Sequence, residues 1–471
     1  MSDFKTSKIS NEMAEIGLLN LTRCGIPLIG EKLAKAATKV KSKLYVRILF
    51  SKNINELQNI IPMIYLHASR NCANLDVRVL LKEKKERNYG ILLDNENNEN
   101  EIFDMEEKLF KHIALGGTFD RLHNGHKVLL STAALLSDKI TCGVTGGDMN
   151  KKKVLYELIE PLSKRIEAVD EFLRDISDGL TLSVQEITDP FGPAIVIEDL
   201  DCLVVSEETV KGGDAVNAKR KERGLNEMTI HKISLVEGSD EILKEVKLSS
   251  STRRRELLGT LLKSPNNDPS LPGKPYIIGL TGGIASGKTH ISKFLEKNGC
   301  EVADADKIVH ELYDGNPEFT RKIAETFGEN LVENGKVNRK KLGEIVFKNK
   351  EKRNILTSII WPAVKNVIME RMKVTKSEIF VIDAALLVEA GWQKNVHQLW
   401  TTFIPRAEAV KRVKERDNLT EEEAESRIDA QTSNETRIQE SHVVFCSLWE
   451  YKETERQVYK ALENVKNNYI N

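Results

Sequence analysis

Residues 282–289 read GGIASGKT, a glycine and four further residues followed by Gly-Lys-Thr, and this spacing strongly constrains the fold. An apolar run, residues 276–280, precedes the segment, and a helical pattern follows it. A strand, a tight glycine turn and a helix in this order form a phosphate-binding loop, because backbone N–H groups and the helix N-terminus attract anions. The sequence therefore predicts a parallel α/β domain that binds nucleotide phosphate.

Two side chains of this loop have defined tasks. Lys288 is expected to reach the β- and γ-phosphates of ATP, and the Thr289 hydroxyl to hold Mg²⁺. A chance glycine-rich turn would not explain the strand and the helix on either side. The expected ATP contacts are Gly282, Gly283, Ile284, Ala285, Ser286, Gly287, Lys288 and Thr289.

The length and the charge limit what else the chain can be. Its 471 residues are too many for one hydrophobic core and favour two or three domains. Lys and Arg number 70 and Asp and Glu 71, so no basic excess indicates a nucleic acid partner. Anionic ligands must therefore be held by local clusters.

The cysteines and the apolar runs indicate where in the cell the protein is expected. Six cysteines are scattered without a CxxC pair, which indicates reduced thiols in an intracellular protein rather than disulfides or a zinc site. No apolar run approaches the roughly 18 residues of a membrane helix. We therefore expect a cytoplasmic protein, and the basic stretch 31–43 leaves mitochondrial association open.

Two polar segments divide the chain. Residues 94–101 read DNENNENE, and residues 264–275 hold four prolines, which continue neither helix nor sheet. The expected pieces are an N-terminal α/β region of unknown role at 1–108, a domain at 109–263, a linker at 264–275 and a domain at 276–471. The first piece has no catalytic constellation, so we expect it to be dispensable for chemistry.

Short apolar runs alternate with helical stretches in the last two pieces. Candidate strands lie at 113–115, 140–144, 202–205, 277–278, 379–382 and 399–403. Continuous apolar strands separated by helices predict two α/β domains with doubly wound parallel sheets. Ligands in such domains bind at the carboxyl ends of the strands.

A pair of histidines follows the first of these strands. Residues 116–130 read GGTFDRLHNGHKVLL, in which Gly116 and Gly117 allow a nucleotide to approach the backbone. His123 and His126 stand three positions apart at a helix start, so both imidazoles can face one phosphate. A single histidine on a helix is usually structural, but two behind a glycine-rich loop favour a catalytic role.

This segment resembles the HxGH nucleotidyltransferase superfamily, which has a Rossmann-like fold. The resemblance implies that Thr118, His123 and His126 contact ATP phosphates and stabilise charge as pyrophosphate leaves. The SSTxxR motif of the superfamily is matched by Ser250, Ser251, Thr252 and Arg255. An exposed basic helix start is the alternative for this second motif.

The intervening residues resemble the phosphopantetheine adenylyltransferase branch of that superfamily. The matching stretches are 150–153, 161–165 and 206–209, with Asn217 and Arg220. The resemblance implies that a lysine after the second strand binds the acceptor phosphate. Lys151, Lys152 and Lys153 are all candidates, and Lys153 is the one we favour.

Two acidic positions accompany the phosphate-binding loop. Residues 301–306 read EVADAD, and two carboxylates two positions apart on a short strand would point the same way. Asp306 is the expected base for a substrate hydroxyl, against the alternative of a merely polar strand end. Asp383 resembles a position that helps to hold Mg²⁺, against the alternative of a buried, capped aspartate.

A charged helical segment, residues 406–431, is a candidate lid. Arg412, Arg416 and Arg427 would clamp the transferring phosphate when the lid closes. The alternative is a surface helix with Glu–Arg pairs along it.

Together with residues 304–307, DADK, these motifs resemble dephospho-CoA kinase. Trp361 departs from the family, since many bacterial relatives have histidine before Pro362.

With both resemblances, in this order, the chain is similar to the bifunctional coenzyme A synthases. They imply adenylyl transfer from ATP to 4′-phosphopantetheine, then phosphorylation of the ribose 3′-hydroxyl of dephospho-CoA, with ATP and Mg²⁺. A fused enzyme for another phosphorylated vitamin intermediate and a GTP-binding switch are the alternatives. The sequence contains no NKxD guanine signature, which argues against the switch.

Overall fold

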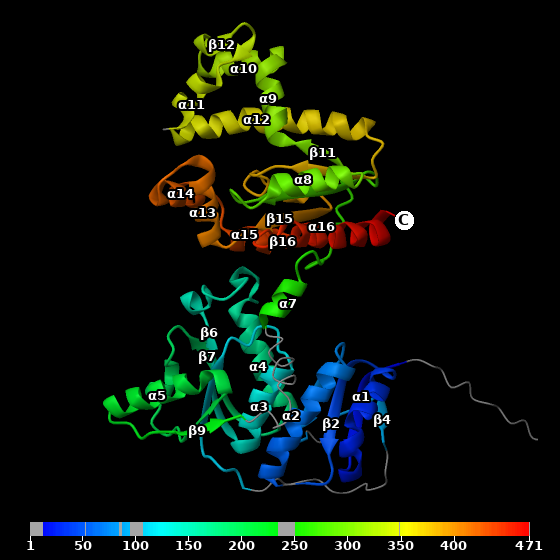
Figure 1. The fold of residues 1–471 in the computed structure, drawn as a ribbon. Coiled ribbons are helices and arrows are strands. Elements are labelled where there is room, and N and C mark those ends of the chain that lie inside the picture. Colours follow the sequence, from blue (N-terminus) through cyan, green and yellow to red (C-terminus); the bar gives the residue numbers. More distant parts are fainter. Residues whose placement is uncertain are drawn as a thin grey trace, which may run out of the picture. The chain divides into compact units, whose positions relative to one another are not determined.

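The computed structural model describes residues 13–51, 53–83, 87–94, 107–233, 250–347 and 349–470. The chain forms two compact units, Met1–Arg253 and Arg254–Asn471. Figure 1 shows the first unit in blue to green and the second in green to red.

The first unit begins with a parallel sheet in the order β3-β2-β1-β4. Its elements are β1(Ala14–Leu21), α1(Ile29–Ala37), β2(Val40–Ile48), α2(Ile54–Asn71), β3(Asp76–Leu80) and β4(Ile91–Leu93). Asn53 caps α2 by accepting the N–H of Glu56, and the strands are rich in Val, Leu and Ile, as expected for a buried parallel sheet.

A second parallel sheet of this unit has the order β7-β6-β5-β8-β9. Its strands are β5(Ile113–Gly117), β6(Lys139–Thr145), β7(Thr181–Ile187), β8(Cys202–Val205) and β9(Thr229–Lys232). Its helices are α3(Asn124–Leu136), α4(Leu162–Ile176) and α5(Val210–Glu222). The helix α7(Ser250–Glu256) spans the boundary between the units.

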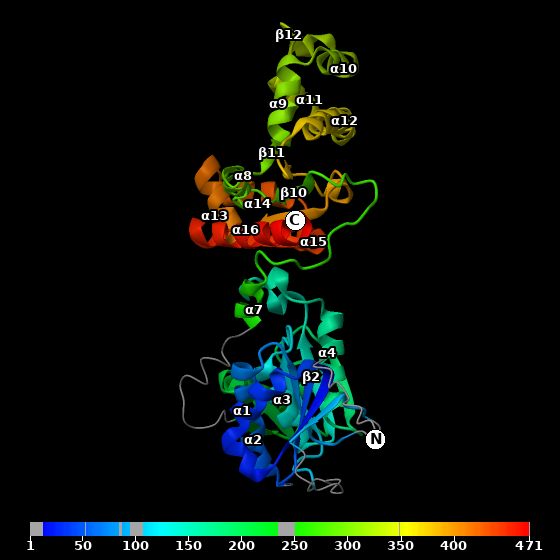
Figure 2. The ribbon, with the colours of Figure 1, turned by 90° about the vertical axis from the view of Figure 1, so that its right-hand side faces the viewer.

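One hydrophobic core joins the two sheets of the first unit. Buried Leu44 and Ile61 from the N-terminal sheet layer belong to the same cluster as Leu130 and Leu135 of α3. Figures 1 and 2 show α2 beside α3, in agreement with the contacts between these helices. The chain also continues the pairing beyond β3, where the Leu81 N–H donates to the Ile176 carbonyl at 2.8 Å. The described residues from Met13 to Leu93 are therefore an integral layer of this unit, the N-terminal layer.

The second unit contains a parallel sheet in the order β11-β14-β10-β15-β16. Its strands are β10(Tyr276–Gly282), β11(Glu301–Asp304), β14(Ile379–Asp383), β15(Gln398–Phe403) and β16(Val443–Cys446), and β12(Val332–Glu333) and β13(Lys336–Val337) form a separate hairpin. Its helices are α8(Lys288–Lys297), α9(Ala305–Gly315), α10(Pro317–Phe327), α11(Arg339–Phe347), α12(Lys350–Val374), α13(Arg406–Asp417), α14(Glu421–Asp429), α15(Asn434–Glu440) and α16(Tyr451–Val465).

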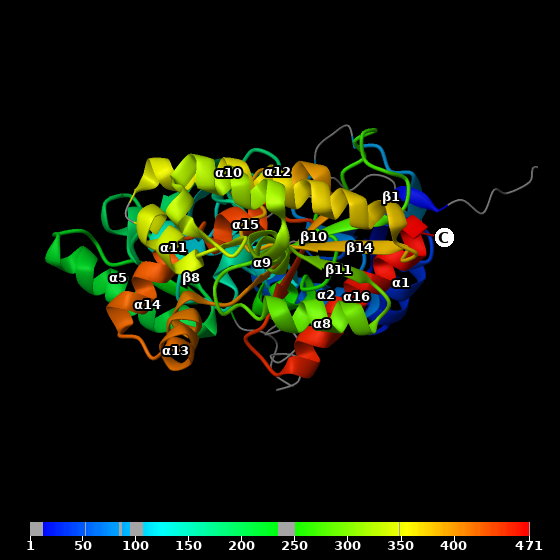
Figure 3. The ribbon, with the colours of Figure 1, turned by 90° about the horizontal axis from the view of Figure 1, so that it is seen from above.

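Helices cover both faces of this sheet, as in a doubly wound fold. Figure 3 shows α8 and α16 side by side, and both pack on the core that contains Ile278 and Leu280. The opposite core contains Ile277 and Phe380 together with residues of α9 and α12. The predicted fold class, parallel-sheet α/β, is confirmed.

The two segments expected to separate domains have different outcomes. Of residues 94–101, only Asp94 lies within the described residues. Residues 264–275 belong to the second unit, and within it the Asn266 N–H donates to the His397 carbonyl at 2.8 Å. This unit begins at Arg254, before the proline-rich segment. The domain boundaries expected from the sequence remain a prediction.

Two further observations concern the whole chain. Cys24 is exposed, Cys72, Cys142, Cys202, Cys300 and Cys446 are buried, and all of them are free thiols. None of the helices that the structure describes has the length and apolar character needed to cross a membrane.

Candidate active sites

The paired histidines lie where β5 passes into α3. His123 is the N-cap residue of α3, and its Nδ1 accepts the backbone N–H of His126 at 3.4 Å. Because Nδ1 of His123 accepts, its Nε2 carries the proton, and this nitrogen lies 3.4 Å from Ser250 Oγ. The two imidazole rings stack with their centroids 3.8 Å apart. The spacing predicted the shared face correctly.

The electrostatics of this pair favour neutral imidazoles. Burial lowers the pKa of His123 to about 4, and the charge of Arg253 acts in the same direction. Burial also lowers the pKa of His126 well below its usual value, with further lowering from nearby positive groups. Nδ1 of His126 is buried and has no hydrogen-bond partner among the described residues. An unpartnered ring nitrogen between positive groups suits an anionic ligand such as a phosphate.

The loop before the histidines is held rigidly. Phe119 and Arg121 have left-handed φ values of 50° and 47°, which are strained for residues with side chains. Asp120, fully buried between them, accepts hydrogen bonds from Arg121 Nη1 and from the Glu160 N–H, both at 3.0 Å. These hydrogen bonds hold the strained backbone in place around the site.

The glycines of this loop have a steric reason. A Cβ at Gly117 would lie 3.1 Å from the Phe119 ring, and one at Gly116 would lie 3.5 Å from the Gly143 carbonyl oxygen. Gly117 is therefore the more restricted of the two positions.

The three candidate lysines differ clearly in place. Lys153 Nζ contacts the Thr118 hydroxyl, and its charge acts on His126. Lys151 is exposed and pairs with Asp148 at 2.7 Å, and Lys152 is also exposed. Only Lys153 of the three lies beside the residues named from the sequence.

The SSTxxR motif lies on α7, with Ser250, Ser251 and Thr252 in its first turn. Arg253, which the sequence reasoning did not single out, is the arginine whose charge acts on both histidines. Arg255 instead lies over the Trp449 ring in the second unit, with its guanidinium carbon 4.3 Å from the ring centroid. Residues 253–255 are all arginine, so the sequence could not show which of them lies beside the histidines.

The phosphate-binding loop of the second unit joins β10 to α8. Gly287 has a φ of 85°, which a glycine adopts without strain, and it precedes Lys288 at the helix start. A Cβ at Gly282 would lie 2.6 Å from the Thr402 carbonyl oxygen, so the backbone admits only glycine there. The exposed Thr289 is in the first turn of α8. The predicted strand, loop and helix are all present.

Lys288 and Asp383 meet at the carboxyl ends of neighbouring strands. Lys288 Nζ and Ser292 Oγ both contact the Asp383 carboxylate. Burial raises the pKa of Asp383, and Lys288 opposes this shift. An oxygen ligand such as Asp383, with the Thr289 hydroxyl, suits Mg²⁺, which takes one or two protein oxygens together with phosphate oxygens and waters.

The expectation that Asp304 and Asp306 share a strand is wrong. Asp304 ends β11 and is the N-cap residue of α9, where its carboxylate accepts the N–H groups of Asp306 and Lys307 at 3.0 and 3.1 Å. The helix therefore begins at Ala305, and Asp306 is exposed in its first turn. Aspartate is a favoured N-cap residue, which explains the early helix start.

The lid candidates occupy two different environments. Arg412 on α13 donates to the Ala285 carbonyl in the phosphate-binding loop at 3.4 Å and to the Ser447 carbonyl at 2.8 Å. Arg416 and Arg427 both pair with Asp417 at the surface. Arg412 thus lies at the loop, Arg427 ties α14 to α13 through Asp417, and Arg416 pairs with Asp417 within α13.

Two further residues lie near the loop: Gln431, which ends the candidate lid segment expected from the sequence, and Arg437, which the sequence did not indicate. Gln431 Oε1 accepts the Ile284 N–H at 2.8 Å. Arg437 is almost fully buried, pairs with Glu389 at 3.2 Å, and would lie 3.2 Å from a Cβ at Gly283. A buried arginine inside a short charged helix cannot be told from a surface one by pattern alone.

Comparisons with known proteins find relatives of both parts of the chain. Residues 276–447 match the family described as dephospho-CoA kinase, and residues 114–264 match the cytidylyltransferase-like family. The dephospho-CoA kinase of Carboxydothermus hydrogenoformans is 39% identical over 195 residues, which cover 40% of this chain and 94% of that protein. The solved dephospho-CoA kinase of Campylobacter jejuni is 27% identical, with a TM-score of 0.31, and the match covers 41% of this chain and 98% of that one.

A relative of the first unit is the phosphopantetheine adenylyltransferase of Saccharomyces cerevisiae. It is 36% identical over 169 residues, which cover 36% of this chain. The chain spans about half of that protein, 54% of its length.

The sheets and the two sites define a nucleotidyltransferase joined to a P-loop kinase. More specifically, the chain belongs to the dephospho-CoA kinase family, and its two matched segments have the arrangement of a fused coenzyme A synthase.

Proposed function

We propose that the chain catalyses the last two steps of coenzyme A synthesis. The first unit transfers the adenylyl group of ATP to 4′-phosphopantetheine, and the second phosphorylates the resulting dephospho-CoA. The observation that carries this proposal is the presence, on one chain, of the stacked histidines beside Lys153 and of the complete phosphate-binding loop.

In the first step, a phosphate oxygen of phosphopantetheine attacks the α-phosphorus of ATP. A new P–O bond forms, the bond to the β-phosphate oxygen breaks, and pyrophosphate leaves. His123 and His126, both neutral, donate N–H groups to the phosphate oxygens on which charge develops. Lys153 holds the acceptor phosphate, and Thr118, Ser250, Ser251 and Thr252 complete the ATP contacts of the first unit.

In the second step, the ribose 3′-oxygen of dephospho-CoA attacks the γ-phosphorus of a second ATP. The bond between the γ-phosphorus and the β–γ bridging oxygen breaks, and ADP leaves. Asp306 takes the hydroxyl proton, and Lys288 neutralises charge on the phosphates. Mg²⁺, when bound to Thr289, supplies further charge neutralisation on the phosphate oxygens. Arg412, Arg416 and Arg427 act from the lid.

The direct test is incubation of the purified chain with ATP, Mg²⁺ and phosphopantetheine, with the products resolved by mass. We expect dephospho-CoA first and CoA afterwards. GTP in place of ATP is a control for the nucleotide-switch alternative, and it should stabilise the chain less in a thermal shift measurement. Absence of both products would contradict the proposal.

The place in the cell and the domain limits belong to the same proposal. We place the enzyme in the cytoplasm, with small-molecule substrates as its partners and no nucleic acid. The adenylyltransferase domain is assigned to 109–263 and the kinase domain to 276–471, after an N-terminal region at 1–108 and a linker at 264–275. These limits come from the sequence pattern described above.

A further inference from the structure

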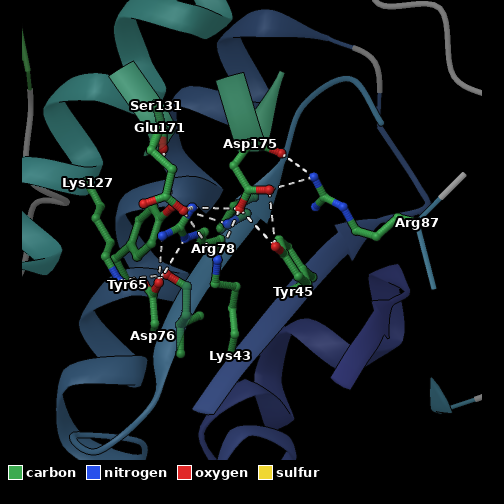
Figure 4. Close-up of polar contacts among 12 residues, drawn as sticks. Lys43, Tyr45, Tyr65, Asp76, Arg78, Arg87, Lys127, Ser131, Glu171 and Asp175 are labelled. Atoms are coloured by element: carbon green, nitrogen blue, oxygen red, sulfur yellow. Dashed lines mark hydrogen bonds and ion pairs between the residues drawn. The ribbon is translucent and has the colours of Figure 1, made fainter. Parts of the chain in front are cut away.

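A cluster of charged side chains lies inside the first unit, between the N-terminal sheet and helices α3 and α4 (Figure 4). Successive residues of a strand alternate between its faces, so Asp76 and Arg78 of β3 point to the same side. Arg78 Nη1 donates to Asp175 at 2.6 Å and to Glu171 at 3.1 Å, and both acceptors are on α4. The Arg78 side chain is only 8% exposed, so these pairs are largely shielded from water.

One member of the cluster comes from the catalytic helix. Lys127 directly follows His126 on α3, and its Nζ donates to the Asp76 carboxylate and to the Val77 carbonyl at 3.0 Å. Asp76 thus stands between two cations, Lys127 and Arg78. Burial raises the pKa of Asp76, but these two cations outweigh it and lower the pKa below its usual value. The carboxylate is therefore charged when it holds Lys127.

A second tie reaches the same helical turn. Asn124 Nδ2 donates to the Tyr65 carbonyl at 3.1 Å and to Ser69 Oγ at 2.8 Å, both on α2. Further along α3, the Tyr65 hydroxyl lies 3.2 Å from Ser131 Oγ. Residues of the N-terminal layer therefore hold the first turn of α3 at Asn124, before His126, and at Lys127, after it.

The orientation of His126 depends on this turn. Its Nδ1 has no partner among the described residues, so no side-chain hydrogen bond at that nitrogen fixes the ring. Positions 124 and 127 lie about 200° and 100° around the helix from position 126, so the anchors and the imidazole use different faces. Holding the anchors therefore sets the direction of His126 without occupying it.

We propose that Asp76 is a positioning residue for adenylyl transfer: from the N-terminal sheet it holds Lys127 and thereby aims His126 at the nucleotide phosphates. This inference rests on the proposed function of the first unit. It gives residues 1–108, for which the sequence indicated no role, a part in the chemistry of the neighbouring domain.

The test measures adenylyl transfer by Asp76→Asn in the full chain. The substitution keeps the shape and removes the charge, so the first turn of α3 loses its ion pair with β3 and keeps only its neutral hydrogen bonds to the N-terminal layer. A misplacement of about 1 Å can lower a rate about 100-fold. We expect kcat for dephospho-CoA formation to fall about 10- to 100-fold, with a smaller change in the KM for ATP. Phosphorylation of supplied dephospho-CoA by the same protein should keep its rate.

The matched control is Asp175→Asn. Asp175 belongs to the same cluster and accepts hydrogen bonds from Arg78, Arg87 and Tyr45, but it is held by no residue of α3 among those described. Its loss should lower the thermal stability of the first unit and leave kcat within about twofold. If Asp175→Asn and Asp76→Asn lower kcat equally, the positioning role is wrong.

The double variant Asp76→Asn/Lys127→Met separates positioning from stability. Removing the ammonium group eliminates the buried unpaired charge, so the melting temperature should recover. The ion pair between β3 and α3 is still absent, so kcat should stay low. Recovery of both quantities would overturn the proposal.

Two outcomes need their own controls. If Asp76→Asn does not fold, Asp76→Glu keeps the charge but lengthens the side chain, and it should also lower kcat. A wild-type kcat in folded Asp76→Glu would then contradict the positioning role. If the wild-type chain itself forms no dephospho-CoA, the proposed function has failed, whatever the variants do.

Discussion

His126 is the side chain on which adenylyl transfer should depend most. Its buried Nδ1 is unpartnered among the described residues, as expected for a group whose partner is the substrate. Loss of one preorganised donor costs about 10²- to 10³-fold in rate. We predict that His126→Ala lowers dephospho-CoA formation by this factor and leaves the kinase step on supplied dephospho-CoA nearly intact.

The control for this prediction is a histidine in the same unit with a different environment. His231 on β9 contacts the Phe110 ring, with centroids 6.5 Å apart, and it is not part of the histidine pair. His231→Ala should retain the adenylyl transfer rate. A normal rate in His126→Ala would remove His126 from the mechanism.

His123 should make the first unit less stable in acid. Its pKa is about 4 in the folded chain and about 6.5 when unfolded, so the unfolded chain binds more protons between these values. Stability is therefore complete above about pH 6.5 and falls as the pH drops toward 4. His123 alone should account for about 1–2 kcal/mol between pH 7 and pH 5.

The variant His123→Asn tests this pH dependence. Asparagine keeps an N-cap acceptor and does not titrate. Urea unfolding followed by circular dichroism should show a smaller difference between pH 7 and pH 5 in the variant than in the wild type. All four tryptophans, Trp361, Trp392, Trp400 and Trp449, lie in the second unit, so their fluorescence identifies that unit's transition. Equal pH dependence in both proteins would contradict the assignment.

Residues with chemically specific tasks could be predicted from the sequence. The geometry brings His123 to His126 in the first unit and places Lys288 beside Thr289 in the second, because each task demands one residue type at a fixed spacing. Arg253, Arg437 and Lys127 could not be found, because their positions depend on contacts between elements that are distant in sequence.

The candidate lid helices, α13 and α14, have arginines in two different environments. Arg412 reaches the Ala285 carbonyl in the phosphate-binding loop, whereas Arg416 is tied to Asp417 at the surface. We predict that Arg412→Ala lowers the kinase rate more than Arg416→Ala does, and that neither changes adenylyl transfer. The measurement is the steady-state rate of dephospho-CoA phosphorylation for both purified variants.

The roles would have to be reassigned if the order were reversed. A full kinase rate in Arg416→Ala would agree with the predicted order and leave that residue only its surface ion pair, a kind of pair that typically contributes about 0–1 kcal/mol.

Element boundaries were the least predictable part of the fold. The central strands of both domains were found from continuous apolar runs, which are typical of buried parallel sheets, but the edge strands β7, β9 and β16 were not expected. The stretch 301–306 failed, because the capping carboxylate of Asp304 turns the chain into a helix after only four strand residues. From the sequence alone, an aspartate that caps a helix cannot be told from an aspartate within a strand.

At the scale of the whole chain, the two chemistries should be separable. Lys288 and His126 belong to different compact units, each with its own sheet. Lys288→Ala should accumulate dephospho-CoA from phosphopantetheine and ATP, with little CoA. Mixing it with His126→Ala should restore CoA, because the intermediate can diffuse between molecules. Failure of folded Lys288→Ala to form dephospho-CoA would refute independent sites.

The N-terminal layer should not be removable, contrary to the expectation from the sequence. It shares a core with α3, so deleting residues 1–101 would uncover apolar residues such as Leu130 and Ala134. We predict that a chain starting at Ile102 is aggregated or loses the cooperative unfolding of its first unit. Size-exclusion chromatography and calorimetry measure this, and a soluble, fully active truncated chain would show that the shared core is unnecessary.

The shared core also has a consequence for biosynthesis. The ribosome releases α2, which ends at Asn71, before α3, which ends 65 positions later at Leu136. At roughly 5–20 residues per second, the nascent layer waits about 3–13 s for its covering helix. During that interval the side of α2 that later meets α3 is exposed to other nascent chains. A holding chaperone that acts on this window would raise the yield of folded enzyme, and slower translation would lower it.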